Sequence, residues 1–181
     1  MKKILPRWAG LLAIGLILSG CASAAKSSGM KVTGLSLGRK VNKSVAVQTS
    51  GGQATKAAGL PQVADKDLGQ AIIESLQASG LFSAVVSVDQ ADYVLNVTFV
   101  KLNQPVFGFT MSVDVEILWS LTPKGQSKTC WEKPITTTAT KGMGDAFSGA
   151  ARVRITTEAA VQENIRQALT ELSKADLAGC N

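Results

Sequence analysis

The sequence predicts an α+β fold, a two-layer sandwich in which two helices pack on one face of a mainly antiparallel sheet of about 4–5 strands. Residues 93–99 and 111–121 alternate apolar and polar side chains with the period of two that half-buried strands show. Residues 68–76 and 161–172 carry apolar side chains at helical spacing. Helical and strand patterns that fall in separate stretches pack as separate layers.

The chain of 181 residues is long enough for one domain with a substantial core. Residues 1–20 have a basic start and an apolar core and are assigned to a signal peptide that is removed, and residues 21–42, which begin with a cysteine, to a lipidated tether and lead-in. Residues 43–181 are assigned to a single α+β domain. Within the tether, residues 22–30 are small and polar, which is typical of a flexible linker.

The first half of the domain is expected to hold two short strands. Residues 44–48 predict the first strand, and the glycines of residues 49–61 predict a loop after it. Residues 84–88 are rich in valine and predict a short, buried strand.

A helix is expected between these two strands. It begins near Lys66, where Asp65 or Asp67 can cap its free amides. Gly80 follows the last apolar residue of the stripe and is predicted to end the helix.

The central strands leave a polar face. Because every second side chain of residues 93–99 and 111–121 is apolar, the side chains between them point to the opposite face. Residues 129–140 predict a threonine-rich strand, in which Pro134 favours an edge position. The polar face is expected to be wetted or covered by a partner, and it includes Asn96, Thr98, Asp114 and Glu116.

The last helix is predicted to start between Asp145 and Thr156 and to run to about Ser173. Polar residues crowd its approach. One interpretation is a polar pocket in which Asp145, Arg152 and Arg154 contact a ligand or partner, with the arginines as anion binders. The interpretation that we favour is structural, with capping by Asp145 or Ser148 and salt bridges of the arginines.

The aromatic residues have two interpretations. Phe107, Phe109 and Met111 form an apolar patch near a turn, which we interpret as core, with a partner or lipid contact as the alternative. Trp119 and Trp131 are interpreted as core and rim packing.

The composition argues against several function classes. The sequence contains no histidine, the commonest general base and zinc ligand. Residues 142–144 contain two glycines, but their spacing fits neither the P-loop nor the dinucleotide-binding fingerprint. Asp114 and Glu116 share a strand face, as in an acid/base pair, but any solvated strand face shows the same pattern. We therefore predict no enzyme, no cofactor and no metal site.

The charge does not indicate nucleic-acid binding. Three of the 19 basic residues leave with the signal peptide, so the mature chain has 16 basic and 13 acidic side chains and a net charge of +3. No run of lysine or arginine remains, and aromatic residues are few.

The first twenty residues have the order of a secretory signal peptide. Lys2, Lys3 and Arg7 form a basic start, and residues 11–18 form an apolar core that is too short to span a bilayer with ordinary flanks. The core ends in Leu-Ser-Gly directly before Cys21, which resembles the lipobox of bacterial lipoproteins. This resemblance implies cleavage before Cys21 and a lipid on its thiol.

A lipidated Cys21 would carry two or three acyl chains, palmitate among them, and two chains hold a protein stably on a membrane. Ala22 follows it, whereas an aspartate there resembles the inner-membrane retention signal of enteric bacteria. The resemblance thus implies attachment to the outer membrane on its periplasmic face. The alternative is a soluble secreted protein that is cut between residues 22 and 25.

Two further cysteines remain, Cys130 and Cys180. An oxidising compartment permits them to form a disulfide. Closing this loop would lower the entropy of the unfolded chain, an effect worth ~4 kcal/mol in the chain-entropy description. Two separate thiols are the alternative, because sequence does not give the distance between the sulfurs.

A diffuse pattern of motifs covers residues 91–172: Gln104-Pro105, the stretch from Gly108 to Val113, Trp131-Glu132, Asp145-Ala146-Phe147, Arg152-Val153-Arg154, Glu158-Ala159-Ala160 and Asn164-Ile165. It resembles a family of small, uncharacterised proteobacterial lipoproteins. Members are sometimes labelled as a sugar-nucleotide acyltransferase. That enzyme class resembles a β-helix of hexapeptide repeats with a catalytic histidine, and this sequence has neither.

A second resemblance lies in the order of the elements. The strand at residues 45–47, the helix over residues 68–80 and the strand at residues 91–95 are similar in order to auxiliary lipoproteins of ABC-type lipid transport and to ring-forming secretion lipoproteins. This resemblance implies an accessory or adaptor role with an envelope protein as partner. The alternative is a carrier of a small apolar or lipid ligand, for which Phe107, Phe109 and Trp119 would line a dry cavity.

Overall fold

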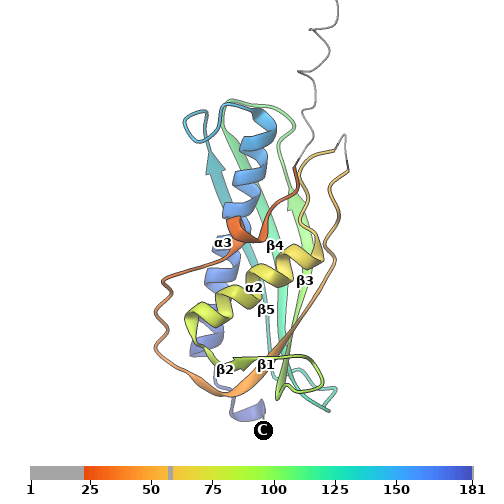
Figure 1. Cartoon of the computed structure of the whole chain (residues 1–181), viewed down its shortest axis with the longest axis vertical. Coiled ribbons are helices and arrows are strands. Elements are labelled where there is room, and N and C mark those ends of the chain that lie inside the picture. Colours follow the sequence, from red (N-terminus) through yellow and green to blue (C-terminus); the bar gives the residue numbers. More distant parts are fainter. Residues whose placement is uncertain (1–22, 57–58, 181) are drawn as a thin grey trace, which may run out of the picture.

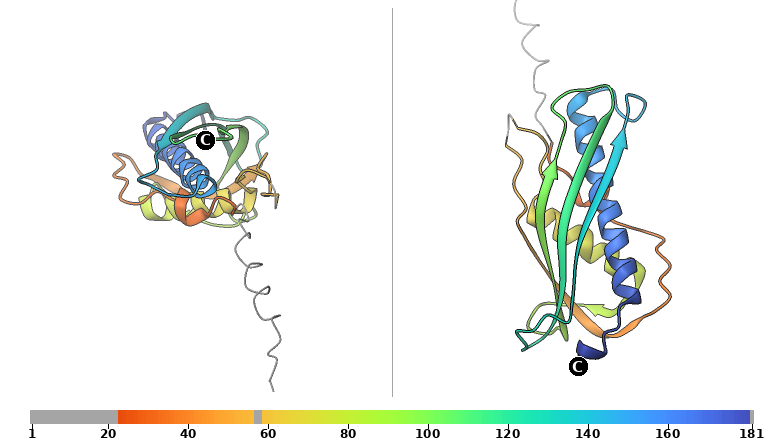
Figure 2. Two further views of the ribbon diagram at one scale, coloured as in Figure 1. Left: turned by 90° about the horizontal axis from the view of Figure 1, so that it is seen from above. Right: turned by 180° about the vertical axis from the view of Figure 1, so that it is seen from behind.

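The computed structural model describes residues 23–56 and 59–180, so the predicted signal peptide and Cys21 lie outside the described residues. A five-stranded sheet, in the order β2-β1-β3-β4-β5, forms one layer (Figure 1). Both long helices pack on one of its faces (Figure 2). The elements are β1 Val41–Ser50, α2 Asp65–Ser79, β2 Phe82–Val85, β3 Tyr93–Asn103, β4 Met111–Pro123, β5 Trp131–Lys141 and α3 Gly149–Lys174.

The predicted α+β sandwich is confirmed, and its sheet is mixed. β3, β4 and β5 form a long antiparallel meander. β1 pairs in parallel with both of its neighbours, β2 and β3. The parallel pairing of β1 with β2 requires a crossover, which α2 supplies across one face of the sheet.

The core lies between β4 and the helices. Alternate side chains of β4 point to the helices, and Val113, Val115, Ile117 and Trp119 are at most 1% exposed. Their partners come from the apolar stripe of α3, where Ile165 and other residues are fully buried. The period of two in the sequence therefore gives the buried face directly.

The two helix starts differ from the prediction. α2 begins at Asp65 with Ala64 as its N-cap, so neither Asp65 nor Asp67 caps it. Asp65 Oδ1 instead accepts from the amide of Gly52 at 2.8 Å. Ser148 is the N-cap of α3, but its hydroxyl makes no capping hydrogen bond.

The end of α2 follows the prediction, whereas the next strand does not. Gly80 adopts a φ of 60° and donates its amide to the carbonyl of Leu76 at 3.0 Å. β2 is a four-residue edge strand in which Ser83 and Ala84 are exposed. The predicted buried strand is therefore wrong, because the sheet places only one neighbour beside it.

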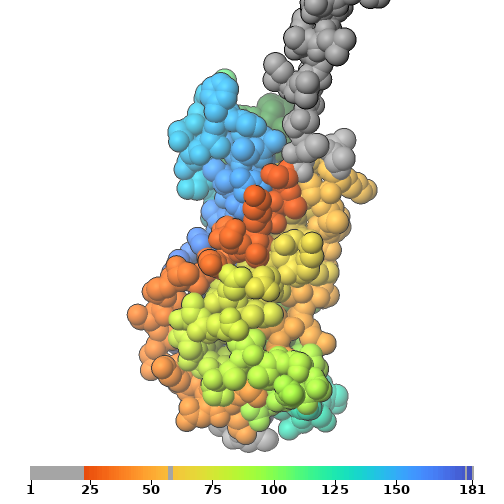
Figure 3. Space-filling view, in the orientation of Figure 1, coloured from red at the N-terminus to blue at the C-terminus, as the bar shows by residue number. Residues whose placement is uncertain are grey.

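The segment before β1 is folded onto the domain. A single helical turn, α1 Ser27–Met30, contacts both α2 and α3. Met30 is fully buried, and the amide of Val32 donates to Ser75 Oγ at 2.8 Å. Figure 3 shows this part of the chain, in red and orange, lying over the helices. The tether predicted for residues 22–30 is thus wrong from Ala25 onward, since Ala25 is 1% exposed.

No helix in residues 23–56 or 59–180 combines the length and the apolar character that crossing a bilayer requires.

Candidate functional site

Two loops meet at the end of the domain where the described chain begins. β4 starts at Met111, which pairs with Lys141, the last residue of β5. The β3–β4 loop over residues 104–110 and the β5–α3 loop over residues 142–148 therefore lie next to each other (Figure 1). The strands end here because the β3–β4 loop contains Pro105 and Gly108, of which Gly108 has a φ of 150°.

Arg152 fastens these two loops to the first turn of α3. It is 6% exposed. Its Nη1 donates to the carbonyls of Ala146 at 2.7 Å and Phe147 at 2.8 Å, and its Nη2 donates to the carbonyl of Gly108 at 3.1 Å. The guanidinium is therefore a crosslink between backbone segments, which differs from both the anion site and the salt bridge considered for it.

Glu158, six residues after Arg152 on α3, binds the N-terminal segment. Its Oε1 accepts from the amide of Lys26 at 2.9 Å and from Arg154 Nη1 at 2.7 Å. A Cβ at Gly29 would overlap the Glu158 carboxylate, so any other residue there would have to displace this carboxylate. Arg154 thus forms the salt bridge that the structural interpretation predicts.

Asp145 closes the β5–α3 loop. Its carboxylate accepts from the amide of Gly142 at 2.9 Å and from Lys141 Nζ at 3.0 Å. The Gly142 amide, and then Lys141, hold the pKa of the Asp145 carboxyl below its ordinary value. Asp145 is a loop residue and does not cap α3.

Gln104 also lies at this end of the domain, and the sequence alone assigned no individual role to it. Its Nε2 donates to the carbonyl of Pro61 at 2.7 Å and to Thr157 Oγ1 at 2.9 Å. The backbone carbonyl of Gln62, next to Pro61, accepts a hydrogen bond from the amide of Ala25 at 3.1 Å. The Gln-Pro pair in the motif pattern is the only signal in the sequence that points to this residue.

The same end carries a cluster of exposed apolar side chains. Phe107 is 87% exposed, Phe109 79% and Phe147 89%, so the interpretation of Phe107 and Phe109 as core is wrong. Met111, the third member of that patch, is 3% exposed and does lie in the core. We call the exposed cluster the apolar tip, and it consists of Val106, Phe107, Phe109, Met143 and Phe147.

The interface between sheet and helices is packed around a polar contact. Trp119 is 1% exposed, and its Nε1 donates to Asn164 Oδ1 at 2.9 Å. Asn164 Nδ2 donates to the carbonyl of Ile135 at 2.7 Å. Because Trp119 is buried here while Phe107 and Phe109 are exposed, the three do not line one cavity, and the predicted carrier has no such site. Trp131 is half-buried at the rim, as predicted.

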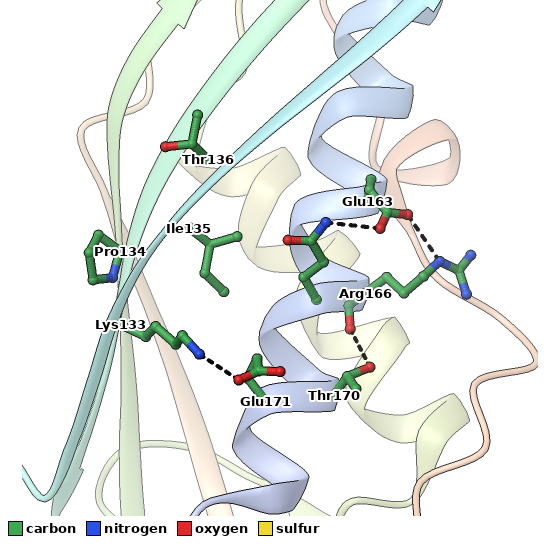
Figure 4. Close-up of a pocket in the computed structure, with 9 residues that line it drawn as sticks. Lys133, Pro134, Ile135, Thr136, Glu163, Arg166, Thr170 and Glu171 are labelled. Carbon is green, nitrogen blue, oxygen red and sulfur yellow. Dashed lines mark hydrogen bonds and ion pairs between the residues drawn. The ribbon is translucent and has the colours of Figure 1, made fainter.

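A groove of about 510 Å³ runs between β5 and α3 (Figure 4). Its wall holds ion pairs, Lys133 with Glu171 and Arg166 with Glu163. The hydrogen bond from Lys133, followed by its positive charge, lowers the pKa of Glu171. The charged lining differs from the apolar surface that a lipid ligand requires.

The other end of the domain holds the disulfide. Cys130, just before β5, is bonded to Cys180 in the short helix η1 Ala178–Cys180. The bridge closes a loop with a sequence separation of 50 residues. In the described residues, no group of three or more histidine, cysteine or acidic side chains is placed to hold a metal ion.

No protein-family model matches the sequence, and no curated protein matches it. Solved structures do match the fold. A DUF330 protein from Xanthomonas campestris has a TM-score of 0.59 at 15% identity, over 75% of this chain and 87% of its own.

Two further structures are similar to the chain. A hypothetical protein from Chlamydia trachomatis has a TM-score of 0.50 at 9% identity, over 71% of this chain and 96% of its own. A minor lipoprotein from Acinetobacter baumannii has a TM-score of 0.50 at 13% identity, over 75% of this chain and 93% of its own. At identities this low, the structural similarity shows a common fold and nothing more.

Proposed function

We propose that the mature chain is a lipoprotein, anchored through Cys21 to the periplasmic face of the outer membrane, that serves as a non-enzymatic accessory of an envelope assembly or transport system. The observation that carries this proposal is the closeness of the domain to Cys21. Ala25, four residues later, already belongs to the core. Four extended residues span at most about 14 Å, so a lipid on Cys21 holds the domain against the membrane.

The contacts of the polar residues support a non-catalytic role. Arg152, Glu158 and Asp145 are each bound to backbone groups that they hold in place. A catalytic side chain has to be free to meet its substrate. Cys130 and Cys180 are bonded to each other, so neither offers a thiolate. The Acinetobacter structure, named a minor lipoprotein, agrees with a lipoprotein of this fold.

The open face of the sheet is the proposed partner surface. Both long helices lie on the opposite face (Figure 2). Polar side chains on the open face are held by hydrogen bonds to one another. Thr138 Oγ1 donates to Asp114 Oδ1 at 2.7 Å, and the hydroxyls of Ser112 and Thr140 lie 3.1 Å apart. A surface with ordered polar groups suits a protein partner, because few side chains lose freedom on binding.

Site-specific photo-crosslinking in intact cells tests the accessory role. A photoreactive residue replaces Thr138 on the open face, and the matched control replaces Gln167, an exposed residue on α3. We expect one discrete adduct with an envelope protein from position 138 and none from position 167. Equal labelling from both positions, or labelling of abundant envelope proteins alone, would show that the proposed partner surface is wrong.

A further inference from the structure

The apolar tip is the main concentration of exposed apolar surface in the domain. Seven large apolar side chains are exposed among the described residues, and five of them belong to the tip. The other two, Val88 and Val100, lie apart on the β2–β3 loop and on β3. Exposed apolar side chains gathered in one place mark a contact with a protein or a membrane.

The tip is an ordered surface. Arg152 binds the carbonyls of Gly108 and Phe147, one from each loop, so it fixes the two halves of the tip relative to each other. The pairing of Met111 with Lys141 closes the sheet directly beneath them. The aromatic side chains are therefore presented to solvent by a held backbone, which costs little entropy on binding.

The tip lies within reach of the proposed anchor. The amide of Lys26 is bonded to Glu158, nine residues after Gly149 at the start of α3, and nine helical residues span about 14 Å. The four residues from Cys21 to Ala25 span at most about 14 Å as well. In Figure 1 the first described residues, in red, enter at the same end of the domain as the β3–β4 and β5–α3 loops.

We propose that the apolar tip inserts into the same membrane leaflet that holds the acyl chains of Cys21. This inference rests on the lipidation of Cys21 in the proposed function. A lipid surface is the occupant that the anchor brings to the tip in every copy of the protein, and aromatic and aliphatic side chains at a domain end enter the headgroup region. With two points of attachment, the long axis of the domain stands away from the membrane and the open face of the sheet stays accessible.

Quenching by brominated lipids tests the insertion. The lipidated full-length mature protein is reconstituted in vesicles of phosphatidylethanolamine and phosphatidylglycerol with brominated acyl chains. In one variant Phe109→Trp places a tryptophan on the tip, and in the matched control Val88→Trp places one on the β2–β3 loop at the far end. Trp119 and Trp131 are common to both, so their emission is subtracted with the parent protein.

We expect bromine to reduce the added emission of the Phe109→Trp variant at least about twofold, as contact with the acyl region requires. The added emission of the Val88→Trp variant should stay unchanged. Equal quenching of both variants, or quenching of neither, would overturn the insertion. A blue shift without bromine quenching would do so too, because it would show a protein or a second copy of the chain on the tip.

The mass of the N-terminal peptide separates this inference from the function on which it rests. If Cys21 carries its acyl chains and the tip is not quenched, the insertion alone is wrong. If Cys21 carries no lipid, both the proposed anchoring and the insertion are wrong. The substituted side chains are exposed, so far-ultraviolet circular dichroism should show unchanged secondary structure in both variants.

Discussion

Two buried polar residues of α3 each bind groups from two other segments of the chain. Arg152 joins the β3–β4 and β5–α3 loops, and Asn164 joins Trp119 of β4 to the carbonyl of Ile135 in β5. Burial of a charge or an amide is unfavourable unless hydrogen bonds replace those to water. Each residue therefore stabilises the fold only while its partners stay in place.

Arg152→Lys should destabilise the domain by about 2–3 kcal/mol. A lysine keeps the charge, but its single ammonium cannot reach three carbonyls on two loops. Urea unfolding followed by circular dichroism measures the change in the free energy of unfolding. Arg39→Lys is the control, because Arg39 is exposed and donates to a single carbonyl, that of Ala175 at 3.0 Å. A loss of stability as large in the control would contradict the assigned role.

The sequence indicates some of these residues and misplaces others. The polar cluster before α3 is visible as Asp145, Arg152 and Glu158, because charges in front of an apolar stripe stand out. Asn164 appears only in the motif pattern, and its contact with Trp119 is missed, since one amide inside an apolar stripe does not change the period of the stripe. Phe107 and Phe109 are wrongly assigned to the core, because aromatic character predicts burial and gives no sign that the chain has passed the end of the sheet.

At the scale of elements, local patterns predict the strands and helices better than their partners. The period of two locates β3 and β4, and Gly80 ends α2 as predicted. The parallel pairing of β1 is not predictable in the same way, because side-chain alternation is equal in parallel and antiparallel strands. α1 is missed because one helical turn has no periodicity, and its burial depends on contacts with α2 and α3.

The contact between β1 and the β2–β3 loop should make the stability of the domain depend on pH. Asp92 Oδ2 accepts from the amide and the hydroxyl of Ser44, both at 2.7 Å, and these bonds lower the pKa of Asp92. A carboxyl whose pKa is lower in the folded state stabilises it above the pKa of the unfolded chain. This contribution is lost as the pH falls through the lowered pKa.

Asp92→Asn should therefore flatten the loss of stability below pH ~4, the ordinary range of aspartate. The variant should be less stable than the parent at neutral pH, and the two should converge in acid. Urea unfolding between neutral pH and pH ~2 measures this slope. Ser44→Ala, which removes one donor, should flatten it in part. Parallel curves for the parent and Asp92→Asn would refute the assignment.

The disulfide ties the start of β5 to η1. Cys180→Ala should lower the free energy of unfolding by ~4 kcal/mol in the chain-entropy description of a loop of this length. Non-reducing mass spectrometry of the mature protein should show the two cysteines as one crosslinked pair. Reductant should destabilise the parent and leave the Cys180→Ala variant unchanged, and an effect of reductant on both would point to another cause.

At the scale of the whole molecule, the two ends of the domain carry different features. The apolar tip and the entry of the chain share one end, and the disulfide and η1 lie at the other (Figure 1). α3 runs from one end to the other, as its 26 residues span about 39 Å. A membrane at the first end therefore leaves the second end far from the lipid.

Cys21→Ala should release the protein from membranes into the soluble periplasmic fraction, because the acyl chains supply the stable attachment and a few exposed side chains alone do not. Immunoblots of membrane and soluble fractions measure the distribution. Ala22→Ser, which keeps the cysteine of the lipobox, is the control and should stay in the membrane pellet. A Cys21→Ala variant that still pellets with the outer membrane would contradict anchoring at this position.

The position of Cys180 also determines when the bridge can form. It follows all strands and both long helices of the described residues, so under the proposed export from the N-terminus Cys130 meets the oxidants of the compartment first. Until Cys180 arrives, the earlier thiol is open to mixed disulfides with other molecules. The bridge therefore closes only after all five strands and both long helices of the described residues have been exported.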